Sequence, residues 1–246
     1  SLPVGFGNSA LFTALQSLAM ANGHPIRTTA NALGLPAHST LAVDLPLTVD
    51  LSDSISLYAG VSGSTTNANG IDLSSFSLTS WTAGFQAEIH QQNGGLFPTV
   101  TLQSTITRAI SSGLFSPTIL TNILEFDYAL DKDQTRGFLA GIQDTRVALS
   151  GAPGEIKASM IGYVGGYYQW PNNWKVTGRG GIQYFGGGQL LNTVHIPPLT
   201  QPVLRIDLDR LDDDDNRIFG LTAEVLWTPK PVYQFTLRTP IYFVRN

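Results

Sequence analysis

The histidines are the first residues to test for metal binding or nucleophilic catalysis. The chain has four, His24, His38, His90 and His195, and it has no cysteine. None of them has a second ligand at the His-x-x-x-His or His-Glu-x-x-His spacing of a helical zinc site. His38 with Ser39, and His90, are the candidates for serine–histidine catalysis, but adjacent strand residues point to opposite faces and do not easily form a dyad. We therefore predict no catalytic residue.

A run of four aspartates is the sharpest local feature of the sequence. Clustered carboxylates suit hard cations such as calcium, although the Asp-x-Asp-x-Asp-Gly spacing of a calcium loop is absent. We favour a solvated acidic turn and keep calcium as the alternative; no other cofactor is predicted. The candidate cation site consists of Asp212, Asp213, Asp214 and Asp215.

Other charged residues alternate with apolar ones and are candidates for the lining of a pore. The acidic candidates are Glu88, Glu125, Asp127, Asp207, Asp209 and Glu224, and the basic ones are Lys175, Arg179, Arg205 and Arg238. In an open pore, separated clusters of such charges would set a transverse field that selects polar solutes and small ions. In a closed, narrow barrel they would pair across the interior and satisfy each other.

The composition limits which elements can position these charges. Only 13% of the 246 residues are charged, while 42% are hydrophobic, against about 25% charged in an ordinary soluble domain. A net charge of −4 argues against general nucleic-acid binding. No stretch approaches the ~18 apolar residues of a membrane-spanning helix, so a closed β-barrel is the remaining way to span a bilayer.

Alternation of apolar and polar residues fills most of the chain after Ser39. In the segment 41–51, for example, Leu41, Val43 and Leu45 share one face, while Ala42 and Asp44 lie on the other. The segments 137–149 and 156–170 are apolar on both faces for part of their length. Tight turns alternate with longer connections up to about residue 202. Aromatic residues gather near expected strand ends, as in an interfacial girdle: Tyr168, Trp170, Trp174, Trp227, Tyr233 and Phe243.

In these features the chain resembles the porin-like β-barrels of the Gram-negative outer membrane. The resemblance is one of pattern over roughly residues 39–246, without a motif of one family, and the chain ends three residues after the aromatic Phe243. It implies a closed antiparallel barrel with charges toward the interior and large apolar side chains toward lipid. The side chains expected to contact lipid include Phe85, Phe126, Phe219, Val225, Phe235 and Leu237. A soluble β-sandwich or lipocalin-like barrel, with the apolar face inside, is the alternative.

We predict about twelve strands in a single domain, with ten as the alternative. Eleven strands follow Leu41, and the weak pattern of residues 24–33 supplies a twelfth. Ten would result if residues 202–211 were a loop and no strand preceded Leu41. The segment 1–38 also contains an expected helix at 8–23, which either lines the interior or packs on the rim of the barrel, and residues 39–246 form the barrel.

The function predicted from the sequence is passive passage of small polar solutes or ions through the outer membrane. Its partners are then outer-membrane lipid and small solutes, and no nucleic acid. A lipid-modifying enzyme of the phospholipase or lipid A deacylase type is one alternative, because such enzymes occur on this kind of barrel. A structural or adhesive barrel is the other. Both are less favoured, since no convincing catalytic cluster is seen and most expected loops are shorter than about 15 residues.

Overall fold

The computed structural model describes residues 39–52, 54–67, 77–110, 116–151, 153–190, 194–213, 217–227 and 231–238. Regular structure in these residues consists of β-strands: β1 (Ser39–Ser52), β2 (Ile55–Asn67), β3 (Ser77–His90), β4 (Thr99–Ala109), β5 (Ser116–Ala129), β6 (Arg136–Ser150), β7 (Gly154–Gln169), β8 (Trp174–Phe185), β9 (Gly188–Leu190), β10 (Val194–Ile196), β11 (Leu199–Leu211), β12 (Arg217–Trp227) and β13 (Pro231–Arg238). The described residues form no helix long and apolar enough to cross a membrane.

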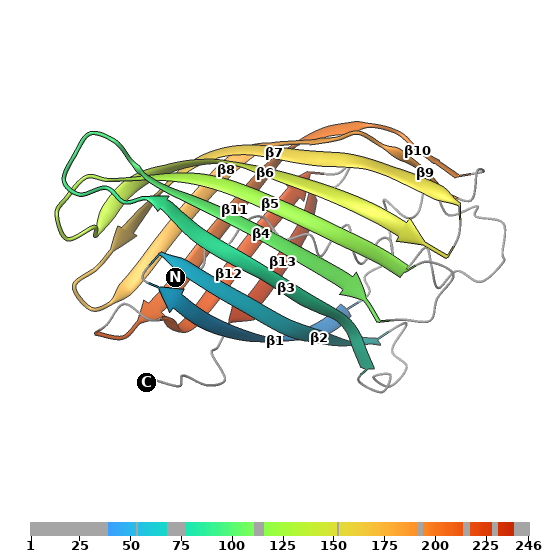
Figure 1. Cartoon of the computed structure of the whole chain (residues 1–246), viewed down its shortest axis with the longest axis horizontal. Helices are drawn as coiled ribbons and strands as arrows, with labels where there is room; N and C mark the ends of the chain where they lie inside the picture. The colour runs from blue at the N-terminus through green and yellow to red at the C-terminus, as the bar shows by residue number, and fades with distance from the viewer. Residues whose placement is uncertain are drawn as a thin grey trace.

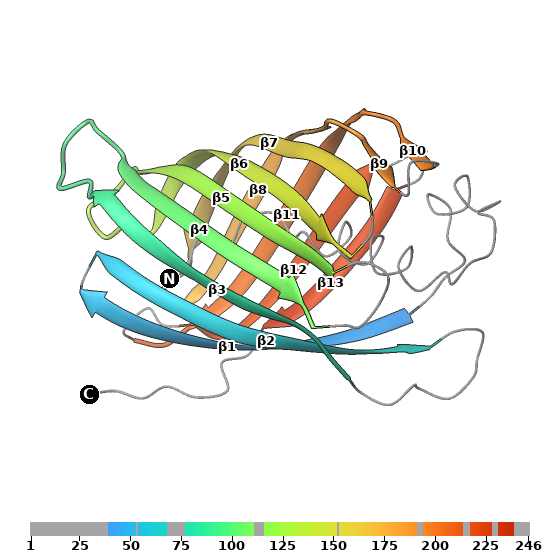
Figure 2. The same ribbon diagram turned by 45° about the vertical axis from the view of Figure 1, so that its right-hand side comes forward.

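The strands form one antiparallel sheet in which neighbours in space are neighbours in sequence. The main path runs through β1–β8 and then β11, β12 and β13, while β9 and β10 lie off this path. The sheet curls around an interior, so that β11–β13 lie behind β3–β5 in both ribbon views (Figures 1 and 2). Neighbouring strands therefore share an inner and an outer face throughout the sheet.

The two ends of the sheet differ in their connections. The connections β1–β2, β3–β4, β5–β6, β7–β8 and β11–β12 lie at one end, which is on the left in Figure 1. We call this the turn end and the opposite one the loop end. At the turn end, β7 and β8 are joined by a tight turn in which Asn173 has a φ of 63° and donates its N–H to the Trp170 carbonyl at 3.0 Å. At the loop end, β9 and β10 form a small hairpin, and β9 also pairs with β7.

Eleven strands on the main path correspond to the eleven segments that the sequence predicts after Leu41. The ten-strand alternative is wrong in its premise, because residues 199–211 form β11 rather than a loop. Within the described residues, no pairing joins the edge strands β1 and β13, so the sheet is not closed there. The predicted helix at 8–23 and the twelfth strand at 24–33 lie outside the described residues.

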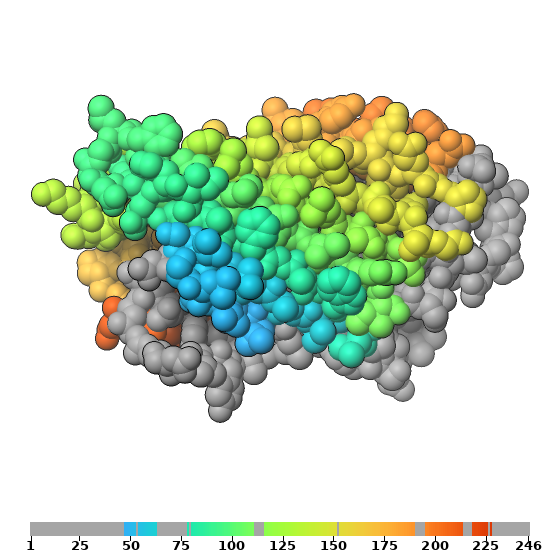
Figure 3. All heavy atoms as spheres, viewed as in Figure 1, coloured from blue at the N-terminus to red at the C-terminus, as the bar shows by residue number. Residues whose placement is uncertain are grey.

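Burial follows the strand alternation in the reverse sense to that of a soluble protein. In β11, Arg205 and Asp207 are each 3% exposed, whereas the intervening Ile206 is 45% exposed. In β5, Glu125 is buried and the next residue, Phe126, is exposed. The outer side chains pack beside each other over β2–β7 (Figure 3). The sheet thus buries charged groups on its inner face and exposes a band of apolar groups on its outer face.

The inner face also holds a cluster of buried apolar side chains. Leu139, Ile161, Val203 and the rings of Tyr163 and Tyr167 pack together and are each at most 8% exposed. The two tyrosines explain why residues 156–170 look apolar on both faces in the sequence. Their rings contribute to the inner packing, while their hydroxyl groups form hydrogen bonds to the carboxylates of Glu125 and Asp127.

Candidate functional site

The candidate site is a group of buried charges on the inner face, which we call the interior charge cluster. It consists of Glu125 on β5, Arg179 on β8, Arg205 and Asp207 on β11, and Glu224 on β12. The strand register aligns Arg179 with Arg205 and Arg205 with Glu224. Asp207 lies two residues along β11 and therefore on the same face. The register brings these charges together although they are far apart in the sequence.

The charges of the cluster are joined by a continuous series of ion pairs. Arg179 bridges two strands, with Nε 3.3 Å from Glu125 Oε2 and Nη1 3.0 Å from Asp207 Oδ2. Arg205 Nη2 lies 2.9 Å from Asp207 Oδ1, and its Nη1 lies 3.7 Å from Glu224 Oε2. All five side chains are at most 10% exposed. Charges buried this deeply need such partners, because removal from water is costly for an unpaired ion.

Two hydroxyl groups add hydrogen bonds to the cluster. The Tyr163 hydroxyl donates to Glu125 Oε2 at 2.8 Å. The Thr222 hydroxyl donates to Asp207 Oδ1 at 2.6 Å. The sequence-based selection found the five charged residues but missed these two, because hydroxyl partners carry no charge pattern. Tyr163 and Thr222 could be found only from the strand register, and the alternation of apolar and polar residues does not determine that register.

Tyr163 reaches Glu125 because a glycine lies between them. The register aligns Tyr163 on β7 with Gly141 on β6, and Gly141 with Glu125 on β5. A Cβ atom built on Gly141 would lie 2.5 Å from both Cζ and Oη of Tyr163. The tyrosine ring therefore crosses β6 over the glycine, and any larger residue at this position would obstruct it.

The same arrangement recurs nearer the turn end. A Cβ atom on Gly137 would lie 2.6 Å from the Tyr167 hydroxyl, and this hydroxyl is hydrogen-bonded to Asp127. Lys175 Nζ lies 4.4 Å from the centroid of the Tyr167 ring, a cation–π distance. The register aligns Lys175 with the buried Asp209. The predicted residues Asp127, Lys175 and Asp209 thus form a second charged group beside the first.

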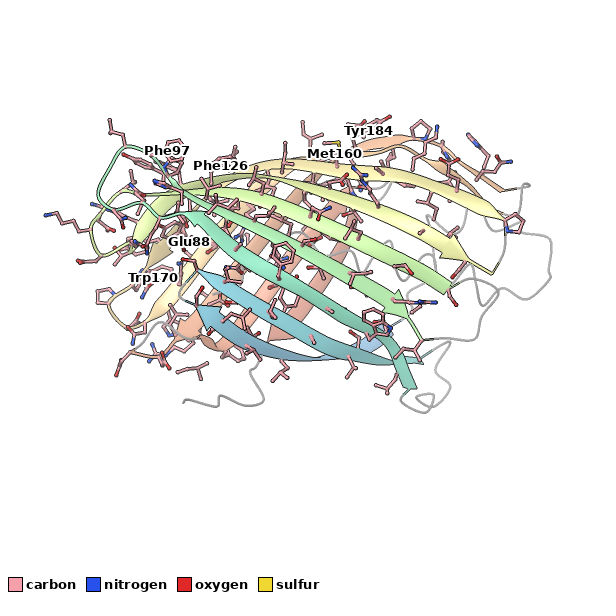
Figure 4. The ribbon with its side chains drawn as sticks, in the orientation of Figure 1. Glu88, Phe97, Phe126, Met160, Trp170 and Tyr184 are labelled. Atoms are coloured by element: carbon pink, nitrogen blue, oxygen red, sulfur yellow. The ribbon has the colours of Figure 1, made fainter. Side chains whose placement is uncertain are left out.

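Two predicted lining residues lie apart from these groups. Glu88 is half-buried near the turn end of β3, and the register aligns it with Thr101 (Figure 4). Arg238 aligns with Gly220 across β12 and β13, and its side chain lies outside the described part of the chain. The structure therefore collects eight of the ten candidate charges on one wall, from β5 to β12.

Of the histidine and aspartate predictions, the structure describes His90, Asp212 and Asp213, which lie at the turn end. His90 Nδ1 lies 3.0 Å from the Pro98 carbonyl, and its ring meets Phe97 edge-on at 4.9 Å, so this histidine orders its own turn. Asp213 accepts a hydrogen bond from Asn173 Nδ2 at 3.0 Å. His38 and Asp214–Asp215 lie outside the described residues. Among the described residues, no group of His, Asp or Glu side chains is placed to hold a metal ion, and calcium stays a prediction.

The outer face carries the large apolar side chains. Phe126, Met160 and Tyr184 lie along the outer side of the curved sheet, and Phe97 and Trp170 lie at the turn end (Figure 4). Of the residues predicted to face lipid, Phe85 and Phe126 are exposed, and Phe219 and Val225 are partly exposed. The side chains of Phe235 and Leu237 lie outside the described part.

Comparison with known proteins identifies the fold. No family model matches the chain, and no curated protein is similar to it in sequence. Among solved structures, an outer membrane channel from Pseudomonas putida matches with a TM-score of 0.51 and 12% identity, over 80% of each chain. The fold is that of this channel. At this level of identity, the likeness is one of architecture alone.

Proposed function

We propose that this chain is a passive channel of the bacterial outer membrane for small polar solutes and ions. The observation that carries the proposal is the reversed burial, in which Arg205 and Asp207 are buried while Leu204 and Ile206 between and beside them are exposed. A soluble β-protein buries its apolar face instead. A lipid environment reverses this preference, because it solvates apolar side chains and leaves the charges to a polar interior.

The extent of the outer apolar band supports a membrane location. Exposed large apolar residues occur on β1–β8, β11 and β12, for example Leu57, Phe85, Phe138, Val164 and Ile182. Soluble monomers rarely expose a continuous apolar surface of more than a few hundred Å². Outer-membrane lipid is therefore the proposed partner of this face. The fold shared with an outer membrane channel agrees with this location.

A channel in lipid requires that the sheet closes. The eleven strands of the main path place Ser39 at the loop end and Arg238 at the turn end. Open strand edges do not occur in the hydrocarbon region, because their N–H and C=O groups would have no partner. We propose that residues 24–33 form the twelfth strand and join β1 to β13. An even strand count then brings both ends of the barrel domain to the turn end, as in bacterial barrels of this class.

A twelve-stranded barrel has room for passage. About eight strands already enclose an interior that side chains alone can fill, so twelve leave additional space. The charge cluster is paired along one wall instead of being divided between opposite walls. Its ion pairs join β5, β8, β11 and β12, and Glu88 stands on a different part of the wall. This arrangement leaves the interior polar without filling it with unpaired charge.

Conductance in a planar lipid bilayer tests this proposal. The chain is refolded into detergent micelles, its folding is checked by heat-modifiable gel migration, and it is added to the bilayer. Discrete and reproducible current steps are expected, and the heat-denatured protein should give none. A parallel lipid-hydrolysis assay tests the enzyme alternative. A folded protein that gives no current, or one that is soluble and monomeric without detergent, would contradict the channel.

A further inference from the structure

Five inward-facing glutamines form a row across the sheet, which we call the glutamine row. The register aligns residues of successive strands in the order Gln86, Gln103, Ile123, Gln143, Ile161, Gln183 and Gln201, from β3 to β11. Amides occupy five of these seven positions, and apolar residues occupy the other two. The inner face therefore carries a neutral amide lining next to the charge cluster.

The amide groups of this row use their donors within the wall. Gln201 Nε2 donates to Gln183 Oε1 at 2.7 Å, and Gln183 Nε2 donates to Ser159 Oγ at 2.9 Å. Gln103 Nε2 donates to the Tyr58 hydroxyl at 3.0 Å. The carbonyl oxygens behave differently. Those of Gln103 and Gln201 are buried and accept no hydrogen bond from the described part of the chain.

Buried acceptors without a donor are unfavourable and indicate a place for a ligand donor or water. Gln201 as a whole is only 7% exposed and lies on the inner face. Its orphaned oxygen is thus a specific feature of the interior and not a surface amide. The row therefore offers one such acceptor near each end, the Gln103 carbonyl on β4 and the Gln201 carbonyl on β11.

A second row of hydroxyl groups runs beside the first, two residues further along each strand. The register aligns Tyr58 with Gly84, and then Thr105, Thr121, Thr145 and Ser159 in turn. We call this the hydroxyl row. From β3 to β11, neither row contains a charged residue at the positions that the structure describes. On β1, the glutamine row continues through Ser56 to the exposed Asp50. Hydroxyls and amides together offer both donors and acceptors, whereas a bare cation would use acceptors alone.

The two rows run obliquely and not around one level of the interior. Strands in barrels of this class tilt by about 40°, and neighbours lie about 4.8 Å apart, so a row that crosses six strand boundaries advances by roughly 18 Å along the axis. The strands slant across the long axis of the sheet in Figure 1. A solute moving through the interior would therefore meet successive amide and hydroxyl groups.

We propose that the glutamine row and the hydroxyl row form a track for neutral polyhydroxylated solutes of the sugar and polyol class. The inference rests on the proposed channel function and names the class of solute it passes. Solute hydroxyls donate to the orphaned amide oxygens of Gln103 and Gln201 and exchange hydrogen bonds with the hydroxyl row, whose members are bonded within the wall. Because each group is neutral, binding is weak at every step and allows the solute to leave again.

Solute-dependent current through the channel tests the track. Maltose or sucrose is added to the bilayer chamber, and a polyether of similar size, which has no hydroxyl donor, serves as the comparison probe. The sugar should reduce the ion current in a saturable manner, and the polyether should not. Gln103→Leu and Gln201→Leu should each weaken this effect roughly three- to tenfold, as expected for the loss of one neutral hydrogen bond.

Matched controls separate the row from a general effect of substitution. Gln189→Leu changes the same residue type at an exposed position of β9, outside the row, and should leave the sugar effect unchanged. If Gln201→Leu fails to fold, Gln103→Leu on a different strand decides the question.

The outcomes distinguish this inference from the proposed channel. If sugars do not affect the ion current, or if methylammonium reduces it and sugars do not, the proposed solute track is wrong. Either result leaves the channel proposal unaffected. If the folded protein gives no current, the channel fails. Saturation-transfer NMR of maltose with the refolded protein in micelles then decides the track: binding that Gln103→Leu weakens supports it, and no binding overturns it.

Discussion

The Arg179 guanidinium lies 3.3 Å from the Glu125 carboxylate, although β6 and β7 separate the two strands that carry them. The curvature of the sheet shortens the distance across its inner face, and Gly141 leaves the space above β6 to the Tyr163 ring. Formation of this ion pair therefore depends on the curvature of the sheet as well as on the attraction between the two charges. The pair links parts of the sheet that strand pairing alone leaves three strands apart.

We expect Arg179→Met to destabilise the folded protein by about 3–5 kcal/mol, because it leaves the buried Glu125 and Asp207 carboxylates without their shared partner. The free energy of unfolding is measured by urea titration in lipid vesicles, with tryptophan fluorescence as the probe. The double variant Glu125→Gln/Arg179→Met should recover part of the loss, since one of the two stranded charges is removed.

Arg146→Met is the matched control for this prediction. Arg146 also forms an ion pair, with Asp144 at 2.9 Å, but its side chain is 71% exposed. An exposed pair contributes only about 0–1 kcal/mol. Equal losses for Arg146→Met and Arg179→Met would show that the interior charge cluster is not buried in solution.

Gly141→Ala tests the packing of Tyr163 across β6. The added Cβ would lie 2.5 Å from the tyrosine ring, and overpacking of this kind costs about 1–3 kcal/mol. Gly162→Ala is the control, because a Cβ at that position meets nothing within 4 Å. The double variant Gly141→Ala/Tyr163→Ala should show less than the sum of the two single losses. Strict additivity would mean that the two residues do not interact.

The strands could be predicted from the sequence because alternation is a local property. Eleven predicted segments correspond to the eleven strands of the main path. Alternation does not mark the start of β5 at Ser116, because residues 118–124 mix polar and apolar side chains on both faces. It does not mark the short β9 and β10 either, since three residues carry no periodicity.

The contacts of the site could not be predicted in the same way. Glu125 and Arg179 are 54 residues apart, and their meeting depends on the register of three successive strand pairs. Alternation assigns each residue to a face but does not fix its position along the neighbouring strand. The roles of Tyr163 and Thr222 follow from that register and were therefore invisible in the sequence.

Phe126→Arg tests whether the outer face contacts lipid. Phe126 is 37% exposed on the outer side of β5, three residues before this strand ends. A basic side chain on the lipid face costs about 2–4 kcal/mol at the bilayer midplane and less toward the interface. Folding efficiency into vesicles is read from heat-modifiable gel migration. Phe126→Leu, which keeps an apolar side chain, should fold as the unchanged protein does. Normal insertion of Phe126→Arg would argue that this face is in water.

The β5–β6 turn predicts a dependence of stability on pH. The Thr135 hydroxyl donates to Asp131 Oδ2 at 2.5 Å, and this hydrogen bond lowers the pKa of the Asp131 carboxyl below its ordinary value of 3.8, with smaller contributions from backbone N–H groups and Arg136. A lowered pKa in the folded state means that Asp131 contributes stability above the ordinary pKa and loses it as the pH falls through the folded pKa.

Comparison of unfolding midpoints between pH 7 and pH 2 measures this contribution. The variant Asp131→Asn should lack the part of the acid-induced loss that belongs to this residue, and Thr135→Val should reduce it. Asp133, an exposed residue of the same turn, provides the control variant Asp133→Asn. If Asp131→Asn and Asp133→Asn change the pH profile equally, the hydrogen bond from Thr135 has no effect on stability.

The balance of charge on the inner face predicts that the proposed channel prefers cations. The inner face carries seven described acidic groups, Asp50, Glu88, Glu125, Asp127, Asp207, Asp209 and Glu224, against three basic ones, Lys175, Arg179 and Arg205. Rings or clusters of acidic side chains favour cations in pores. The reversal potential in a potassium chloride gradient should therefore have the sign of a cation-selective pore.

Glu88 is the residue at which this preference is best altered, because it is half-buried and stands apart from the interior charge cluster. Glu88→Lys should shift the reversal potential toward anions, and Glu88→Gln should shift it about half as far, in proportion to the change in charge. Glu155→Lys alters the charge equally at an exposed position at the start of β7 and should have a smaller effect. The effect should fade at high ionic strength, since salt screens charges within about 3 Å at 1 M. A reversal potential that Glu88→Lys leaves unchanged at low salt would place the ion path away from β3.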